Sequence, residues 1–374
     1  MYLHALANVT PAQQLTQREC WEILRRARAT RRLQARSRAV LEKILTGDNG
    51  IETRHFALPD LEGIFDLDAE ALNAAFEREA PALGERALRA ALAQAGLAAG
   101  DLDALVVCTC TGYLCPGLSS FVSERVGLRS DVFMQDIVGQ GCGAAIPSLR
   151  SVSHVLAARP GARVACLAVE ICSAAFYLDD DPGVLVSLCL FGDGASASIW
   201  NGHPGPTGLR CADFDTLHQP AGRECLRFEN RGGKLRNKLD KTVPARAAAA
   251  VRELFGRLAA GQNGGAPVDG RAGIGRVLTH AGGKKVLEAL AGALDGRFPL
   301  AESAAVLRRC GNMSSPSVLF ALGEYLQRGA RGEGDSAAAE VSSPTAANGE
   351  DLWLTSFGAG FTCHALRLTR AEPA

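Results

Sequence analysis

The hydrophobic positions of the chain form short, continuous apolar blocks that alternate with stretches of helical periodicity. Leu105–Cys108 and Val164–Glu170 are apolar at nearly every position, which is typical of strands buried on both faces. Amphipathic stretches such as Leu118–Val126 and Ala144–Ala158 lie between such blocks. This alternation predicts an α/β fold with parallel or mixed sheets. Further strands are predicted at Val132–Ile137 and Ala195–Trp200, and further helices at Ala69–Glu77 and Leu83–Ala95.

The second half of the chain repeats this pattern, so we expect a duplicated βαβ architecture. It divides into an N-terminal half, 1–205, and a C-terminal half, 206–374. Residues 329–350 are rich in Gly, Ala, Ser and Glu, which predicts a flexible surface loop before a core strand. The elements predicted in this half are strands at Val277–His280, Asp351–Ser356 and Phe361–Leu368, and helices at Lys284–Ala293 and Ser317–Gln327.

The pattern of two further stretches does not settle their structure or role. Residues 18–45 predict one helix with many arginines between Arg25 and Arg38. A solvated helix face explains this charge, and a surface for an anionic carrier or a coenzyme phosphate is the alternative. The apolar run Val184–Phe191 has only the length of a strand, and no run approaches the 18 residues of a membrane span.

Composition excludes several classes of protein. The 374 residues are 47% hydrophobic and 21% charged, the balance of a globular chain. Forty basic and 40 acidic residues cancel, so no general attraction to nucleic acid or an anionic membrane is expected. The first residues lack the pattern of a signal peptide, which predicts a cytoplasmic protein. The 12 cysteines form no C-x-x-C pair, so we expect buried thiols and no metal site.

One cysteine has the surroundings of a nucleophile. Cys142 lies between Gly141 and Gly143, at the first turn of a predicted helix. Glycine permits a tight turn and close approach of a substrate to the backbone. The partial positive charge of a helix N-terminus favours a thiolate, which predicts a lowered pKa for Cys142. A buried structural thiol is the alternative.

A cysteine nucleophile needs a base, and His280 is the histidine best placed for that role. It ends a predicted strand and precedes the turn Ala281–Gly283, and strand ends are where α/β proteins place their sites. Asn312 precedes a predicted helix, where capping is the alternative role. A Cys, His and Asn set fits two classes of enzyme: cysteine hydrolases and enzymes that condense acyl thioesters.

Five motifs narrow this choice. With them the chain resembles the type III polyketide synthases, the chalcone synthase-like branch of the thiolase superfamily. The resemblance covers about residues 100–368 and implies a duplicated, five-layer αβαβα fold. The motifs are Gln140–Gly143, Leu190–Ala195, Thr279–Gly283, Gly311–Ser315 and Ser356–Thr362, in family order.

The resemblance also implies roles for single residues. Cys142 resembles the acyl-accepting nucleophile, His280 its imidazolium partner, and Asn312 the residue that holds the thioester oxygen with His280. Decarboxylation of a malonyl thioester makes an enolate, whose oxygen needs preorganised N–H donors such as these. Phe191 resembles the gatekeeper at the mouth of the CoA tunnel. The other substrate-binding residues implied are Cys110, Cys115, Cys172, Ser187, Asn237 and Ser314.

Two positions depart from the plant pattern. Asn237 stands where plant relatives carry a second gatekeeping Phe. Cys115 stands where they carry a Met that reaches into the neighbouring subunit's cavity. The missing Phe and the small cavity residues favour a fatty acyl starter and an alkylpyrone or alkylresorcinol product.

The resemblance implies a homodimeric enzyme that loads an acyl group from acyl-CoA onto Cys142. It would extend the group with malonyl-CoA and cyclise the product, with no carrier protein, metal or redox cofactor. The alternatives are a single-round enzyme like ketoacyl-ACP synthase III, a cysteine hydrolase and a catalytically silent scaffold. Met313 argues against the first of these, because ketoacyl-ACP synthases usually have Thr after the Asn.

Overall fold

The computed structural model describes residues 1–261, 273–331 and 351–370, and a nine-stranded sheet runs through them. Its order is β11-β12-β13-β8-β1-β7-β6-β4-β5. Parallel and antiparallel neighbours are mixed, as predicted: β4 is parallel to β5 and β6, whereas β7 is antiparallel to β6. The strands are β1 (Tyr2–Val9), β4 (Ala104–Cys108), β5 (Phe133–Ile137), β6 (Val164–Glu170), β7 (Gly194–Asn201), β8 (Leu209–His218), β11 (Ile274–Thr279), β12 (Asp351–Gly358) and β13 (Thr362–Arg370).

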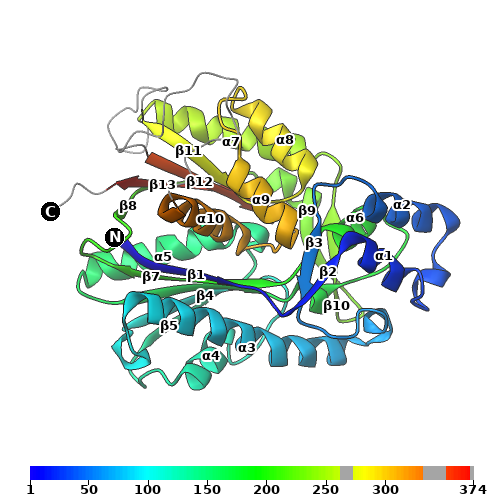
Figure 1. Cartoon of the computed structure of the whole chain (residues 1–374), viewed down its shortest axis with the longest axis horizontal. Coiled ribbons are helices and arrows are strands. Elements are labelled where there is room, and N and C mark those ends of the chain that lie inside the picture. The colour runs from blue at the N-terminus through cyan, green and yellow to red at the C-terminus, as the bar shows by residue number, and fades with distance from the viewer. Residues whose placement is uncertain (262–272, 332–350, 371–374) are drawn as a thin grey trace.

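The sheet has two wings that are stacked through a middle layer of helices. Figure 1 shows α5 (Ala145–Ala158) and α10 (Ser317–Arg331) between the wings. The helices α3 (Ala69–Ala95) and α4 (Leu118–Val126) cover one outer face, and α7 (Val243–Ala259) and α8 (Lys284–Ala293) cover the other. This is the αβαβα layer order that was predicted from the sequence.

The two wings are joined at one register pair, Tyr2 on β1 with Arg210 on β8. The predicted division at residue 205 falls in the connection between β7 and β8, and the assignment of two halves stays a prediction. The loop predicted at 329–350 starts inside α10, which extends to Arg331. Its remaining residues, and 371–374 of the predicted C-terminal half, lie outside the described residues.

Several predicted elements have the predicted bounds, and others do not. The helices α4 and α8 and the strand β6 are confirmed to the residue. The single helix predicted at 18–45 is wrong: α1 (Gln17–Leu24) and α2 (Ala35–Thr46) are separated by a 3₁₀ turn. The two helices predicted at 69–95 are one, α3, which contains Pro81.

The strand-length run Val184–Phe191 belongs to the helix α6 (Pro182–Leu190). Asp181 caps this helix, because its carboxylate accepts hydrogen bonds from the backbone N–H groups of Gly183 and Val184. Most residues of α6 are buried, so the helix carries no polar stripe and its sequence shows no helical period. The helix α2 packs against α6 at one end of the molecule (Figure 1).

Two small two-stranded sheets lie outside the nine-stranded sheet. One joins β2 (Gln13–Thr16) to β3 (Thr53–Phe56), and the other is the hairpin of β9 (Leu226–Arg231) and β10 (Lys234–Leu239). Between these elements the chain also forms α9 (Ala301–Cys310). No helix of residues 1–261, 273–331 and 351–370 is both long and apolar enough to cross a membrane.

Candidate active site

The three predicted catalytic residues lie in three separate loops. Cys142 lies in a 3₁₀ turn just before α5, His280 directly follows β11, and Asn312 lies just after α9. Gly141 has a φ of +58°, and a side chain there would place its Cβ 2.9 Å from the backbone nitrogen of Ala359. Glycine before Cys142 is therefore required by both conformation and space.

Ser314 connects the three residues. Its backbone N–H donates to Asn312 Oδ1 at 2.8 Å, and its hydroxyl donates to Cys142 Sγ at 3.3 Å. A backbone hydrogen bond also relates Ser314 to the His280 ring. Ser314 has a φ of 60°, a left-handed conformation that costs a non-glycine residue energy and persists where surrounding contacts hold it. The sequence placed Ser314 among the cavity residues but gave no sign of this connecting position.

Asn312 is held on both sides. Its side-chain amide donates to the Gly282 carbonyl at 3.3 Å, next to His280. Its backbone N–H donates to Leu190 O at 2.9 Å, and its carbonyl accepts from Gly192 N–H at 3.0 Å. These bonds fix the loop of the predicted gatekeeper, Phe191, against the Asn312 loop.

His280 is buried and its ring packs edge-on against Phe357, with centroids 5.1 Å apart. Burial lowers the pKa of His280 to about 4, although the hydrogen bond with Ser314 acts in the opposite direction. Its Nδ1 has no hydrogen-bond partner among the described residues. The imidazole is therefore neutral at pH 7, with one nitrogen able to accept a proton.

Cys142 does not have the lowered pKa that the sequence predicts. Burial raises the pKa of its thiol to about 12, and the Ser314 hydrogen bond opposes this rise only in part. The Glu170 carboxylate raises the pKa further. Desolvation of the thiolate thus outweighs the partial charge of the nearby helix N-terminus. In the free enzyme the Cys142 thiol and the His280 imidazole are thus both neutral, whereas the resemblance implies an imidazolium at His280.

Cys142 and Ser314 line a cavity of about 630 Å³, a volume that includes the open space at its mouth. The expected residues Phe191, Cys172, Ser187 and Asn237 line it together with Leu188, Leu226 and other apolar side chains. Two expected residues do not line it. Cys110 lies behind Ser314, with its sulfur 3.0 Å from the Ser314 hydroxyl, and Cys115 is exposed on the loop after β4.

The family model for the N-terminal domain of chalcone and stilbene synthases matches residues 2–204. The chain is also 32% identical over 297 residues to a 3,5-dihydroxyphenylacetyl-CoA synthase of Streptomyces toyocaensis, a match that covers 75% of this chain and 74% of the relative. The chain is a type III polyketide synthase of the chalcone and stilbene synthase family. It is therefore an acyltransferase that condenses acyl groups with malonyl-CoA by decarboxylation.

Other relatives agree. The synthase is 34% identical to the 1,3,6,8-tetrahydroxynaphthalene synthase of Streptomyces peucetius subsp. caesius, over 78% of this chain and 77% of the relative. The solved structure of the 1,3,6,8-tetrahydroxynaphthalene synthase of Streptomyces coelicolor A3(2) matches this chain with a TM-score of 0.81 and 26% identity over 100% of both chains. PKS-I of the brown alga Ectocarpus siliculosus has the same thiolase-type fold, with a TM-score of 0.85, 24% identity and coverage of 99% and 98%.

This family assignment selects the polyketide synthase over the ketoacyl-ACP synthase, hydrolase and scaffold alternatives. The roles of Cys142, His280 and Asn312 stay predictions that their geometry supports. No group of three His, Cys, Asp or Glu side chains within the described ranges is arranged to hold a metal ion. That the synthase needs no metal or redox cofactor also stays a prediction.

The cavity of the synthase has lining and supporting side chains that the sequence did not reveal. Phe228, opposite Asn237 in the β9–β10 hairpin, lines the cavity, as do Phe176 and Tyr177. Buried Arg54 donates to the backbone carbonyl of Phe191 at 2.7 Å and so holds the loop of this predicted gatekeeper. The Gly232–Gly233 pair between two short runs is a hairpin signal that would have located Phe228.

Glu170 ties the loops of the synthase together behind the nucleophile. One carboxylate oxygen accepts from the backbone N–H groups of Cys110 and Thr111 at 3.0 and 3.1 Å, and the other accepts from the Ser315 hydroxyl. Burial raises the pKa of Glu170, and these hydrogen bonds oppose the rise. Both carboxylate oxygens of Glu170 thus have hydrogen-bond donors within the protein, which supports a structural role.

Proposed function

We propose that the synthase loads a fatty acyl group from acyl-CoA onto Cys142, extends it with malonyl-CoA and cyclises it to a pyrone or resorcinol-type product. The observation that carries the catalytic part is the Ser314 connection, which links Cys142, His280 and Asn312 beside the cavity that Cys142 and Ser314 line. The family assignment supports the same chemistry.

In the loading step, the neutral His280 imidazole takes the Cys142 proton as the sulfur attacks the acyl carbon. The CoA thiolate leaves and takes that proton from the imidazolium. Burial lowers the pKa of His280, so its imidazole is neutral at pH 7 and enters the step as a base and not as an acid.

In the extension step, malonyl-CoA loses CO₂ and forms an enolate. The Asn312 amide and the N–H of neutral His280 donate to the enolate oxygen. The enolate carbon then attacks the acyl thioester on Cys142, which releases the Cys142 sulfur and lengthens the chain by two carbons. Asn312 donates to the Gly282 carbonyl in the free enzyme, so a substrate oxygen replaces a weak 3.3 Å bond.

The cavity lining supports the fatty acyl starter. Ala175, Val184, Leu188 and Leu226 contribute apolar surface to the cavity lining. Transfer of each CH₂ group of a starter to such a surface is favourable by about 0.8 kcal/mol.

A second candidate product is a small polyhydroxylated aromatic ring built from a short starter. Two relatives are named for such products, 1,3,6,8-tetrahydroxynaphthalene and 3,5-dihydroxyphenylacetyl-CoA. The cavity also holds a polar pair, in which the Asn237 amide donates to the Ser187 hydroxyl at 2.7 Å. A pair of this kind suits a polyketide rich in oxygen better than an alkyl chain.

We also propose that the synthase is a homodimer that pairs through β5. This strand ends the sheet order, so one of its edges has no neighbour in the described structure. Phe133, Met134 and Val138 are 52%, 42% and 50% exposed, and Tyr113 on the loop beside Cys115 is 69% exposed. A second copy would cover this apolar edge, which otherwise favours aggregation, and would bury Cys115 near the interface.

The test is mass spectrometry of products from purified enzyme with malonyl-CoA and short, aromatic or long acyl-CoAs, together with light scattering. We expect pyrones or resorcinols that contain a long starter plus two or three acetate units, from a dimer. Naphthalene or benzene products from short starters alone would establish the second candidate. A single-round β-ketoacyl product, or a requirement for carrier protein, would contradict both. A monomer would contradict the dimer.

A further inference from the structure

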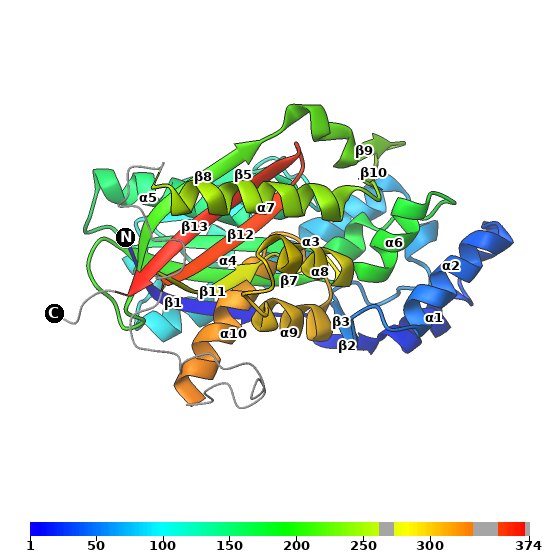
Figure 2. The same cartoon turned by 90° about the horizontal axis from the view of Figure 1, so that it is seen from above.

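One wall of the cavity is the β9–β10 hairpin, and the adjoining wall is α6, which packs against β10. Figure 2 shows the hairpin at one end of the molecule, beside α6. Phe228 and Asn237 are register partners in the hairpin, and both line the cavity. From α6, Val184, Ser187 and Leu188 line it. The position of the hairpin against α6 therefore affects the shape of the cavity that both elements line.

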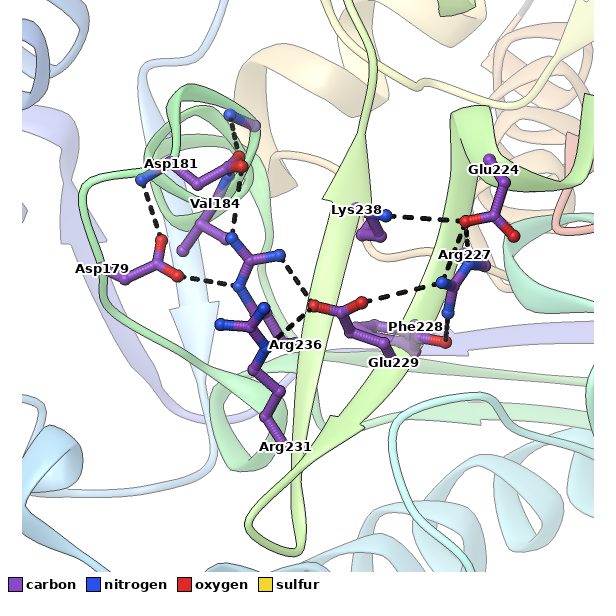
Figure 3. Close-up of polar contacts among 11 residues, drawn as sticks. Asp179, Asp181, Val184, Glu224, Arg227, Phe228, Glu229, Arg231, Arg236 and Lys238 are labelled. Carbon is purple, nitrogen blue, oxygen red and sulfur yellow. Dashed lines mark hydrogen bonds and ion pairs between the residues drawn. The ribbon is translucent and has the colours of Figure 1, made fainter.

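A buried arginine joins the two walls. Arg236 precedes Asn237 in β10, and only 6% of its surface is exposed. Its guanidinium contacts three carboxylates: Asp179 at 2.7 Å, Glu229 at 2.9 Å and Asp181 at 3.2 Å (Figure 3). We call these four residues the Arg236 clamp. Glu229 belongs to the hairpin, whereas Asp179 and Asp181 belong to the loop that leads into α6.

The clamp acts directly on the start of α6. Asp181 caps the helix through Gly183 and Val184, and Asp179 accepts from the Asp181 backbone N–H at 2.9 Å. Arg236 thus holds the cap of α6 and the cavity-facing Asn237 in one rigid unit. Asn237 adds its own bond to Ser187 on α6.

The charges make Arg236 irreplaceable in this unit. Within the described ranges, Asp179 and Asp181 have no other ion-pair partner, whereas Glu229 also contacts Arg227 and Arg231. Without Arg236, three carboxylates would face one another at the edge of the protein interior and repel. The loop before α6 and the β9–β10 hairpin would then move apart, because both extend to the protein surface.

We propose that Arg236 is a positioning residue that holds the β9–β10 hairpin against α6 and so sets the shape of the cavity that both line. Through that shape it determines which acyl chain lengths the synthase accepts and how many extensions it performs. This inference rests on the proposed function only in that the cavity holds the growing chain. Arg236 touches no reacting group, so the chemical step of loading Cys142 at saturating starter does not depend on it.

The experiment compares Arg236→Met with Arg231→Met, a matched control that removes an exposed partner of the same Glu229. For each variant we would measure Cys142 acylation in a single turnover, kcat and KM for starters that differ by two carbons, and the product distribution. The starter is whichever acyl-CoA the wild-type enzyme uses, so failure of the proposed fatty acyl starter leaves this test intact.

Arg236→Met should load Cys142 as the wild type does, but should lose about tenfold of the discrimination between starters that differ by two carbons, mainly through KM. Products with one more extension should appear. Arg236→Lys should restore part of the discrimination, because one ammonium group serves fewer carboxylates than the guanidinium. Arg231→Met should keep the wild-type profile.

A folded Arg236→Met enzyme with wild-type discrimination and products would overturn the inference, and so would an equal change in Arg231→Met. If Arg236→Met does not fold, Asp179→Asn takes its place, since it removes one charge at constant size. It should shift the profile in the same direction by a smaller amount, and a wild-type profile there would overturn the inference as well.

Discussion

The catalytic centre and the cavity wall of this synthase are held together by different interactions. At the centre, Ser314 joins Cys142 and Asn312 by hydrogen bonds between groups that carry no charge, and burial keeps both Cys142 and His280 neutral. At the wall, Arg236 joins two elements by charge (Figure 3). The chemistry and the shape of the cavity are therefore separable, and substitutions in one region should leave the other largely unchanged.

The largest effect is expected at the nucleophile. Cys142→Ala should abolish acyl loading, because no other thiol stands next to both Ser314 and the cavity. Intact-protein mass spectrometry after exposure to acyl-CoA measures this directly. The control is Cys110→Ala, which removes the other sulfur that contacts Ser314 and should still load. Continued product formation by Cys142→Ala would refute the assignment of the nucleophile.

The next effect separates the two steps of the reaction. Asn312→Ala should slow malonyl decarboxylation by about 10²–10³-fold, since it removes one donor to the enolate. Acyl loading should fall less. Asn312→Asp is the control that keeps an acceptor for the Ser314 N–H while losing the donor, and it should show the same selective defect. Equal losses in CO₂ release and in loading would contradict the role of Asn312.

A smaller effect is expected at the connecting residue. Ser314→Ala removes the hydrogen bond that lowers the pKa of Cys142, so that pKa should rise further. A neutral hydrogen bond contributes about 1 kcal/mol, so the iodoacetamide reaction of Cys142 at pH 8 should slow by roughly fivefold. Ser187→Ala, which changes only the wall, should leave this rate unchanged. A faster reaction would show that Ser314 protects the thiol.

The pH dependence of stability is the mildest test. A histidine that is neutral in the folded state with a pKa of about 4, and ordinary when unfolded, stabilises the fold fully above pH 6.5. That contribution, about 3 kcal/mol at most, is lost as the pH falls from 6.5 to 4. His364 shares this property, because burial lowers its pKa to about 4 as well. The melting temperature should therefore drop over this range, and His280→Gln should reduce the drop. An unchanged slope would contradict a buried neutral His280.

The sequence predicted the parts of this structure that depend on neighbours along the chain. The alternation of apolar blocks and amphipathic stretches located β6, α4 and α8. Short motifs selected Cys142, His280 and Asn312 as catalytic candidates, and their roles stay predictions.

What the sequence did not show depends on contacts between distant segments. The helix α6 is buried and has no polar face, so periodicity could not reveal it. The pKa of Cys142 follows from desolvation by the whole fold, whereas the motif displays only the helix start. Ser314 and Arg236 owe their roles to partners up to 204 and 57 residues away in the sequence.

The most direct test of the account is the mass spectrum of intact enzyme and released products after incubation with an acyl-CoA and malonyl-CoA. We predict an acyl adduct on Cys142 and cyclised products that contain the starter and more than one acetate unit, with no carrier protein present. An unmodified Cys142 together with such products, or an adduct that never extends beyond one condensation, would contradict it.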